Sequence, residues 1–437
     1  MENKKDIKQY FINQFNEFEK SLNGEKSSDF HKIRKDAISK FAELTFPTQK
    51  DEEWKYTNIS PLFSYDFIAG KKLQVEKKII DKFLFDELEH SLMVFVNGYY
   101  APELSRIEGL PKNVIISSLA EEIKNNNPVV AKYFSKYAKQ ENQIFTALST
   151  AFTKDGAFIY VPDGKVIENT IHIIFLTTSE QKIYTQPRNL FVVGKNSQAT
   201  IIEHYISDNN ASVYFTNSVT EIIADENAVV DHIKLQEESK NAFHIARMEV
   251  DQEKSSNFSS HLISTGAQLS RNDFNARFND EVGECMLNGL FMIGDEQLFD
   301  AHTMIDHAKP HCQSHEHYKG ILQDKSKGVF NGKVMVRQGA QKTNAFQENN
   351  TILLSDNAVM NTKPQLEIFA DDVKCSHGAT IGKLNEDAMF YLKSRGIGEE
   401  AATAIMIHAF ASDVITSIKI PALRDYLEKI ISQRFNQ

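Results

Sequence analysis

The stretch GVFNGKVMVRQGAQKTNAFQENNTILLSDNAVMNTKP, residues 328–364, contains the pattern that decides the fold. The β-rich run GVFNGKVMV is followed by the polar segment GAQKTNA, and a second such segment, SDNAVMN, comes soon after. Short apolar runs bounded by Gly, Asn, Asp and Ser are typical of strands joined by turns. Hardly any helical period interrupts them, so this part of the chain is predicted to consist of β-structure.

The same pattern extends over the middle region, from about Gly156 to Ile381. Its other β-rich runs are AFIYVP, IHIIFLTT, NLFVVG, ATIIEHYI, SVYFTNSVTEIIA, AVVDHIKLQ and CMLNGLFMIG. So much β-structure without crossover helices indicates a sandwich, a barrel or a β-solenoid. The short loops and their recurring small polar residues favour a solenoid of stacked rungs, although the period is irregular.

Both ends of the chain are predicted to be helical. Apolar residues recur at helical spacing over residues 7–22, and a second helix is expected over 27–44 with Ser28 or Asp29 as its cap. Near the C-terminus, three helices are expected after Asn385, which caps the first of them. We therefore divide the chain into a mostly helical domain at 1–150, a β core at 151–382 and a helical domain at 383–437.

Composition limits the class of protein. The chain has 437 residues and a formal net charge of −10, which disfavours nucleic acid or an anionic membrane as the main partner. Three cysteines do not make a disulfide framework and suit a reducing compartment. The charged N-terminus lacks a signal-peptide core, and no apolar run is long enough to cross a bilayer, so we expect a cytoplasmic protein.

One segment is dense in potential metal ligands. The stretch HTMIDHAKPHCQSHEH contains Cys312 together with His302, His307, His311, His315 and His317. Imidazole and thiolate are the usual ligands of zinc, copper and iron, so a stand-alone metal-binding protein is one hypothesis. No pair has a recognised finger spacing, however, and a polar edge of the β-domain is the favoured interpretation.

A second candidate is ADDVKCSHGATIG, residues 370–382. If this segment is extended, Val373, Cys375 and His377 lie on one side of it, with neighbouring Cα atoms of the set about 6–7 Å apart. Two ligands cannot complete a metal shell of about four, and a Cys–His nucleophile would need a third, orienting group. From spacing alone, a buried thiol beside a hydrogen-bonded histidine is favoured.

Common enzyme signatures are missing from the sequence. It contains no Walker-type phosphate loop, no Gly-x-Gly-x-x-Gly after a strand and no Gly-x-Ser-x-Gly elbow. A β-helix enzyme acting on carbohydrate stays open as an alternative, because such enzymes place carboxylates on one solenoid face. No pair of carboxylates in this sequence marks such a site.

A resemblance to a known family changes which of these hypotheses is favoured. Residues from about 325 to 415, including GKVMVRQGAQKTNAFQENN and DDVKCSHGATIG, strongly resemble the shared core of the SufB/SufD family, scaffold components of the SUF iron–sulfur cluster assembly machinery. DEEWKYTN at 51–58 and FVNGYYAPELS at 95–105 are similar to the N-terminal part of that family. Within the family, the KCSHGAT segment resembles the sequence of the SufD branch more than that of the SufB branch.

The resemblance implies a mainly β fold, a right-handed parallel β-helix flanked by helical domains. It also implies a non-catalytic scaffold subunit that pairs with SufB through the end of the β-helix and binds SufC, the ATPase of the complex. His377 matches the histidine of the cluster-assembly site shared with SufB, and Cys375 is the neighbouring thiol. No cofactor would be bound stably by the chain alone, and an iron–sulfur cluster would form transiently in the complex.

The same resemblance implies that the C-terminal helices dock on SufC. The residues expected to take part are Phe390, Tyr391, Arg395, Met406 and Phe410. A homodimer of the isolated chain through the edge that SufB would use stays open as an alternative, because exposed edges pair readily.

Overall fold

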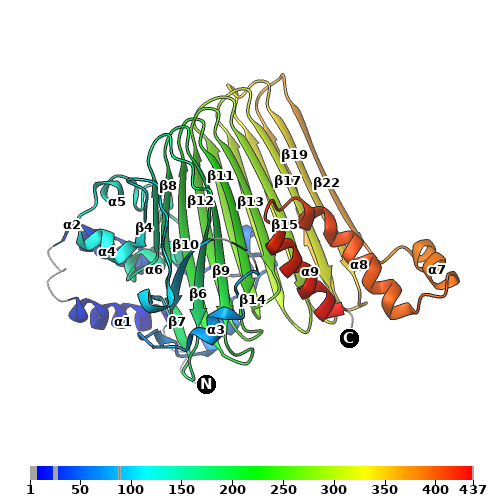
Figure 1. Cartoon of the computed structure of the whole chain (residues 1–437), viewed down its shortest axis with the longest axis horizontal. Helices are drawn as coiled ribbons and strands as arrows, with labels where there is room; N and C mark the ends of the chain where they lie inside the picture. The colour runs from blue at the N-terminus through cyan, green and yellow to red at the C-terminus, as the bar shows by residue number, and fades with distance from the viewer. Residues whose placement is uncertain (1–6, 23–27, 87, 89, 436–437) are drawn as a thin grey trace.

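The computed structural model describes residues 7–22, 28–86, 88 and 90–435 and shows a parallel β-solenoid with helices at both ends (Figure 1). The predicted fold class, mainly β with a parallel β-helix core and flanking helices, is confirmed. The first residues of the charged N-terminus, 1–6, lie outside the described residues.

Successive strands of the solenoid fall alternately into two sheets. The first sheet runs through β4 (Ile115–Ser118), β5 (Ala157–Val161), β8 (Arg188–Val193), β10 (Tyr214–Ala224), β12 (Phe243–Gln252), β14 (Leu269–Phe278), β16 (Leu298–His307), β18 (Lys327–Val336) and β20 (Val359–Thr362). Beside this path, β1 (Ile68–Ala69) pairs with β7 (Ile183–Thr185), β7 pairs with β10, and β21 (Gln365–Ile368) pairs with β18.

The second sheet contains the strands between these. In order of pairing it runs through β3 (Tyr99–Tyr100), β2 (His90–Val96), β6 (Thr170–Thr177), β9 (Gln198–Ser207), β11 (Val229–Glu237), β13 (Asn257–Ser264), β15 (Glu284–Ile293), β17 (Gln313–Leu322), β19 (Asn344–Leu353) and β22 (Lys374–Gly382). Since β2 joins this sheet through β6, the N-terminal region contributes to the solenoid, and the proposed domain boundary at residue 150 stays a prediction.

One line of turns repeats the same backbone position from rung to rung. A positive φ recurs at Asn196, Asn227, Ser255, Val282, His311 and Lys342. The backbone N–H of Asn196 donates to Glu226 O in the next turn at 2.9 Å, and that of Asn227 donates to Lys254 O at the same distance. Asparagine tolerates the left-handed region better than most residues, which explains why small polar residues recur in these loops.

The space between the two sheets holds both apolar and polar side chains. Phe95, Phe175 and Tyr205 stack along it, with ring centroids 5.1 and 4.7 Å apart. His232 Nε2 lies 3.2 Å from Glu203 Oε1, and both side chains are buried. Because a buried carboxylate needs such partners, polar residues inside the solenoid are paired across rungs and are not signs of a surface.

The N-terminal helices cover the outer face of the first sheet. Helices α1 (Ile7–Ser21), α2 (Asp29–Glu43) and α6 (Ile144–Ala151) contribute Phe11, Phe41 and Phe145 to a cluster with Phe215 and Phe243 of that sheet. The Ser28 side chain accepts a hydrogen bond from the backbone N–H of His31, so the predicted cap of the second helix is confirmed. The region also contains the short helices η2 (Glu52–Trp54), η3 (Ser60–Ser64), α3 (Lys77–Asp81), η4 (Pro102–Leu104), α4 (Leu119–Lys124) and α5 (Pro128–Tyr133).

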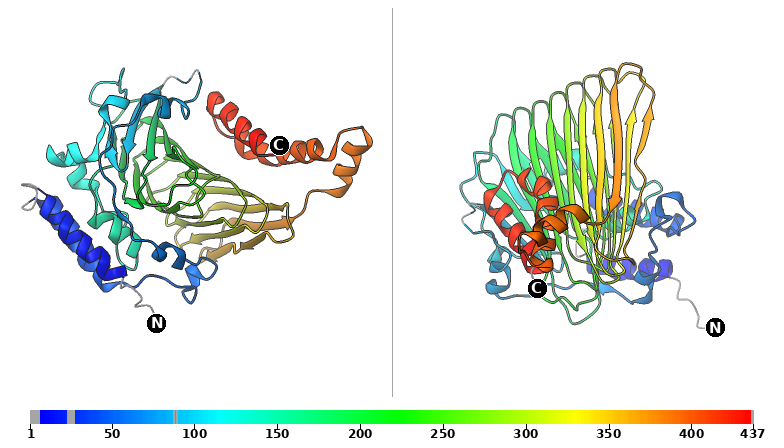
Figure 2. Two further views of the ribbon diagram at one scale, coloured as in Figure 1. Left: turned by 90° about the horizontal axis from the view of Figure 1, so that it is seen from below. Right: turned by 90° about the vertical axis from the view of Figure 1, so that its right-hand side faces the viewer.

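The C-terminal helices are α7 (Glu386–Ser394), α8 (Glu399–Thr416) and α9 (Pro421–Phe435). The first begins at the predicted cap, since the Asn385 side chain accepts from the backbone N–H of Ala388. Helices α8 and α9 fold back over the outer face of the second sheet (Figure 2), where Ile407 and Leu427 pack in one cluster with Ile263. Among the described residues, no helix is long and apolar enough to cross a membrane.

Candidate functional site

The solenoid ends in strands that have a neighbour on one side only. Within the described residues, β22 pairs with β19 alone, and β20 and β21 pair with β18 alone. Most of β22 is exposed, and large apolar side chains are exposed around this end at Phe346, Val359, Ile368, Phe369 and Ile381. The last rung therefore presents unpaired backbone groups together with apolar side chains.

Cys375 and His377 both lie on β22, and the prediction that they share one face is confirmed. Their register partners on β19 are Ala345 and Gln347, which are buried in the solenoid. Cys375 is half-buried and packs beside Ala345, whereas His377 is exposed. Burial raises the pKa of the Cys375 thiol, although a hydrogen bond with the Ala345 backbone acts in the opposite direction.

This pair of side chains fits iron–sulfur chemistry but does not complete a site. Thiolate and imidazole are both found as ligands of iron–sulfur clusters. In the part of the chain that the structure describes, no group of three or more His, Cys, Asp or Glu residues is arranged to hold a metal ion. Two side chains leave a metal shell of about four ligands incomplete.

The fold separates the histidines between residues 302 and 317. His302 lies on the outer face of the first sheet beside Asp300, whereas His307 lies in the core and forms a 2.8 Å hydrogen bond with Ser314. On the second sheet, His315 stacks on Phe346 with ring centroids 5.4 Å apart. Their closeness in sequence therefore does not make a metal site, and the stand-alone metal-binding hypothesis loses its basis.

The other two cysteines are buried away from this end. Cys285 is fully buried, and burial raises its pKa. Cys312 is buried in a turn, where its Sγ lies 3.4 Å from Asp280 O. Neither thiol lies on the last rung, which contains Cys375 on β22.

Comparison with known proteins identifies the family. A sequence model of the SUF system FeS cluster assembly SufBD core domain matches residues 175–410, and one of the SufBD protein N-terminal region matches residues 5–173. The chain belongs to the SufBD family. The predicted resemblance to that family, drawn from residues 325–415, 51–58 and 95–105, is thereby confirmed and extends over most of the chain.

Individual SufBD relatives extend over nearly the same length. An iron–sulfur cluster assembly SufBD family protein of Synechocystis is 36% identical over 421 residues, 94% of this chain and 93% of its own. SufD of Escherichia coli is 31% identical over 394 residues, 89% of each chain. SufD of Bacillus subtilis is 26% identical over 414 residues, 92% of this chain and 93% of its own.

In this SufBD-family chain, α7 projects at the same end as the last strands (Figure 1). It contains no buried residue, and Phe390 and Tyr391 are 74% and 56% exposed. The Arg395 guanidinium lies 5.2 Å from the centre of the Tyr391 ring. Three side chains of the predicted SufC-binding set are thus accessible on one short helix and its C-terminal cap.

The remaining two residues of that set lie on α8, and both are half-buried. Phe410 packs beside the second sheet, where Lys319 Nζ donates to its carbonyl oxygen at 2.8 Å and lies 4.7 Å from its ring centre. Met406 lies one turn earlier. A cleft of about 730 Å³ separates the start of these helices from the last turns of the solenoid, and Met389 and Phe390 line it.

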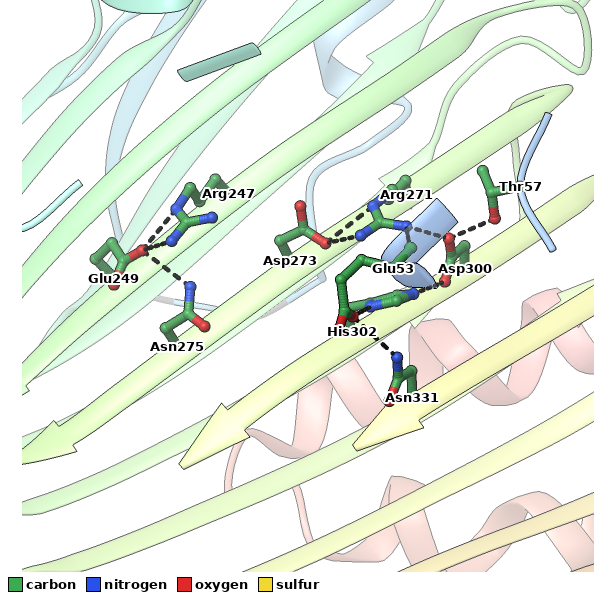
Figure 3. A network of polar contacts seen from close by, with 10 residues as sticks. All are labelled: Glu53, Thr57, Arg247, Glu249, Arg271, Asp273, Asn275, Asp300, His302 and Asn331. Carbon is green, nitrogen blue, oxygen red and sulfur yellow. Dashed lines mark hydrogen bonds and ion pairs between the residues drawn. The ribbon is translucent and has the colours of Figure 1, made fainter. Parts of the chain in front are cut away.

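The SufBD motif DEEWKYTN forms a strap, residues 51–58, on the outer face of the first sheet (Figure 3). Arg271 Nη1 lies 2.7 Å from Asp300 Oδ2 and also donates to Glu53 O at 2.7 Å. Thr57 Oγ1 donates to the same carboxylate at 2.5 Å. His302 bridges the strap and the sheet, with ring nitrogens 3.2 Å from Glu53 Oε2 and 3.0 Å from Asp300 Oδ1.

The charges in this cluster stabilise one another. Burial and the positive charge of Arg271 lower the pKa of His302, but the negative charge of Asp300 and the hydrogen bonds with Asp300 and Glu53 outweigh them and raise the value to about 9. Burial likewise raises the pKa of Asp300, but His302 and Arg271 bring it down to about 2. In the sequence, only the family resemblance marks the strap. Its contacts on the sheet, such as that of Arg271 with Glu53, join residues more than 200 positions apart, so no local pattern reports them.

Proposed function

We propose that this SufBD-family chain is a non-catalytic scaffold subunit of the SUF machinery, pairing with SufB at the open end of the solenoid. The observation that supports this most directly is the incomplete Cys375–His377 pair on β22, an edge strand with one neighbour among the described residues. An edge strand with unpaired N–H and C=O groups is a ready template for another chain. A partner that adds its own strand there would bring ligands to the same point.

The iron–sulfur cluster is the cargo of this site and does not reside in the chain. Cys375 and His377 would supply up to two ligands, and SufB would supply the others. Both side chains must lose a proton before they ligate iron, so assembly on this pair depends on pH. The isolated chain would bind metal weakly because its own set is incomplete.

The C-terminal helices are proposed to bind SufC, the ATPase of the complex. Exposed Phe390 and Tyr391 provide apolar contact area, which supports docking through α7. Helix α8 is held to the second sheet by the Lys319–Asp413 ion pair at 2.5 Å, and Lys419 after it contacts Asp231 at 2.9 Å. A pull on α7 would therefore be transmitted to the solenoid, which could open the SufB interface during cluster assembly.

The test is anaerobic cluster formation in the chain co-expressed with SufB and SufC. We expect His377→Ala to lose most of the cluster, read by absorbance and iron content, while the three chains still purify together. His315→Ala is the matched control, because His315 lies on the outer face of β17, two rungs before β22, and stacks on Phe346. An unchanged cluster yield in His377→Ala would refute the assignment of His377 to the assembly site.

A further inference from the structure

A column of polar side chains lies behind His377. Glu316 on β17, Gln347 on β19 and His377 on β22 are in register on three consecutive rungs of the second sheet. Glu316 and Gln347 are 3% and 2% exposed and face the core, where Tyr318, two residues further along β17, belongs to the main apolar cluster. In-register residues of a parallel sheet stack about 4.8 Å apart, so His377 is the next group in line.

Within the column, the Gln347 side chain makes a hydrogen bond through its amide nitrogen but not through its amide oxygen. Its Nε2 donates to Glu316 Oε2 at 2.5 Å. Its oxygen, Oε1, is buried and has no hydrogen-bond partner in the part of the chain that the structure describes. A buried polar atom left unpaired destabilises the folded state, so a carbonyl oxygen in this position calls for an explanation.

The facing sheet makes room for this amide. Gly332 lies on β18, and a Cβ atom at that position would stand 2.1 Å from Gln347 Nε2. A methyl group there would collide with the amide, so glycine is required for Gln347 to reach into the core beside Glu316. The amide is therefore held by features of both sheets and not only by its own strand.

We propose that Gln347 is a positioning residue for His377. When a partner covers the last rung, the Gln347 amide oxygen accepts a hydrogen bond from one ring N–H of His377. The other ring nitrogen is then free of its proton and faces the partner as a ligand. Glu316 fixes the direction of the amide, because a carboxylate accepts only from the NH2 side and so keeps the oxygen turned away from itself.

This arrangement follows the general chemistry of ligating histidines. The nitrogen that binds metal is selected by the hydrogen bond that the other nitrogen makes, and loss of such a supporting partner typically costs about 10- to 100-fold in metal affinity. The inference rests on the proposed function in one respect only, that His377 works at a covered solenoid end. Gln347 itself would touch neither cluster nor partner.

The experiment reads the tautomer of His377 directly. The full chain, labelled with ¹⁵N in its histidine rings, is purified with co-expressed SufB, and its ring nitrogen spectrum is recorded at pH 8. The His377 signals are assigned by their absence in His377→Ala. We expect one neutral tautomer in the native complex and a mixture of tautomers in Gln347→Met, which has no acceptor oxygen.

Gln313→Met is the control, since Gln313 is exposed on β17 and should leave the spectrum unchanged. Mixed tautomers in the native complex, or no change in Gln347→Met, would overturn the inference. If Gln347→Met does not fold, Glu316→Gln provides the second test, because the amide then loses its fixed direction and the single tautomer should be lost. A cluster yield that does not respond to His377→Ala would refute the proposed function and leave the tautomer result standing.

Discussion

At the residue scale, the buried carboxyl group of Glu316 has a pKa that its residue type alone does not suggest. Glu316 is buried in the solenoid, and burial raises its pKa to about 7, while hydrogen bonds from Thr303 and Gln347 act in the opposite direction. The ordinary value of such a carboxyl group is 4.5. The folded state therefore binds this proton more tightly than the unfolded state, and the associated stabilisation is lost as pH rises from about 4.5 through 7.

Replacing this carboxyl group should stabilise the protein in a pH-dependent way. At pH 8 the native state must keep Glu316 ionised in the core, at a cost on the order of 1–3 kcal/mol. We expect Glu316→Gln to raise the free energy of unfolding by about that amount at pH 8 and by much less at pH 5, measured by urea denaturation. Glu348→Gln, on the exposed face of β19, should change it by less than about 0.5 kcal/mol. An equal effect of Glu316→Gln at both pH values would contradict the assignment.

Sequence alone could predict those contacts and orientations of single residues that depend on neighbours in the sequence. The caps at Ser28 and Asn385 are local, and the shared face of Cys375 and His377 follows from the alternation of side chains along a strand. The contact of Gln347 with Glu316 joins residues 31 positions apart. It depends on the register between rungs, which no local pattern reports.

At the scale of elements, charged contacts help to hold the strap at residues 51–58 to the first sheet. The positive charge of His302 lies between Glu53 and Asp300. Because the pKa of His302 is raised from 6.5 to about 9, its contribution to stability is complete below pH 6.5 and is lost as pH rises through 9. Deprotonation should therefore loosen the strap before the solenoid unfolds.

Trp54, the single tryptophan of the chain, reports on this event. Its ring centre lies 3.7 Å from the Arg271 guanidinium, so release of the strap would expose the indole to water. We expect a red shift of tryptophan emission between pH 8 and 10 with a midpoint near pH 9.

His302→Asn is the control for this titration, because it removes the group whose charge changes and should abolish the step. Asp300→Asn should loosen the strap already at pH 7.5, since removing one partner of a buried ion cluster costs about 3–5 kcal/mol. Constant emission of the native protein up to pH 10 would show that the strap does not depend on His302.

For the whole molecule, the sequence predicted that a β-rich core lies between two helical regions. It gave only a weak indication that this core is a solenoid. Rungs of unequal length blur the period, and buried polar residues such as Glu203 and His232 interrupt the apolar pattern that would mark a core. The same stacking explains the two ends of the solenoid. At the first end the sheets finish with β3 and β4, which pair antiparallel with β2 and β5, whereas at the other end, within the described residues, they finish with the parallel strands β20, β21 and β22.

The open end and α7 lie on the same side of the molecule (Figures 1 and 2), so one chain could bind two partners there through separate surfaces. We expect the double variant Phe369→Asp, Ile381→Asp to stop co-purification with SufB and to retain SufC. Each carboxylate buried without a partner costs about 3 kcal/mol, roughly 100-fold in affinity. Both native side chains are exposed, so the thermal midpoint should change little.

The reciprocal variant, Phe390→Asp with Tyr391→Asp on α7, should lose SufC and retain SufB. The two variants serve as controls for each other, because they add the same charge at the same end of the chain. If either one released both partners, the edge and α7 would form a single continuous interface. If the edge variant still bound SufB, pairing would have to occur elsewhere on the solenoid, and the Cys375–His377 face would lose its proposed source of further ligands.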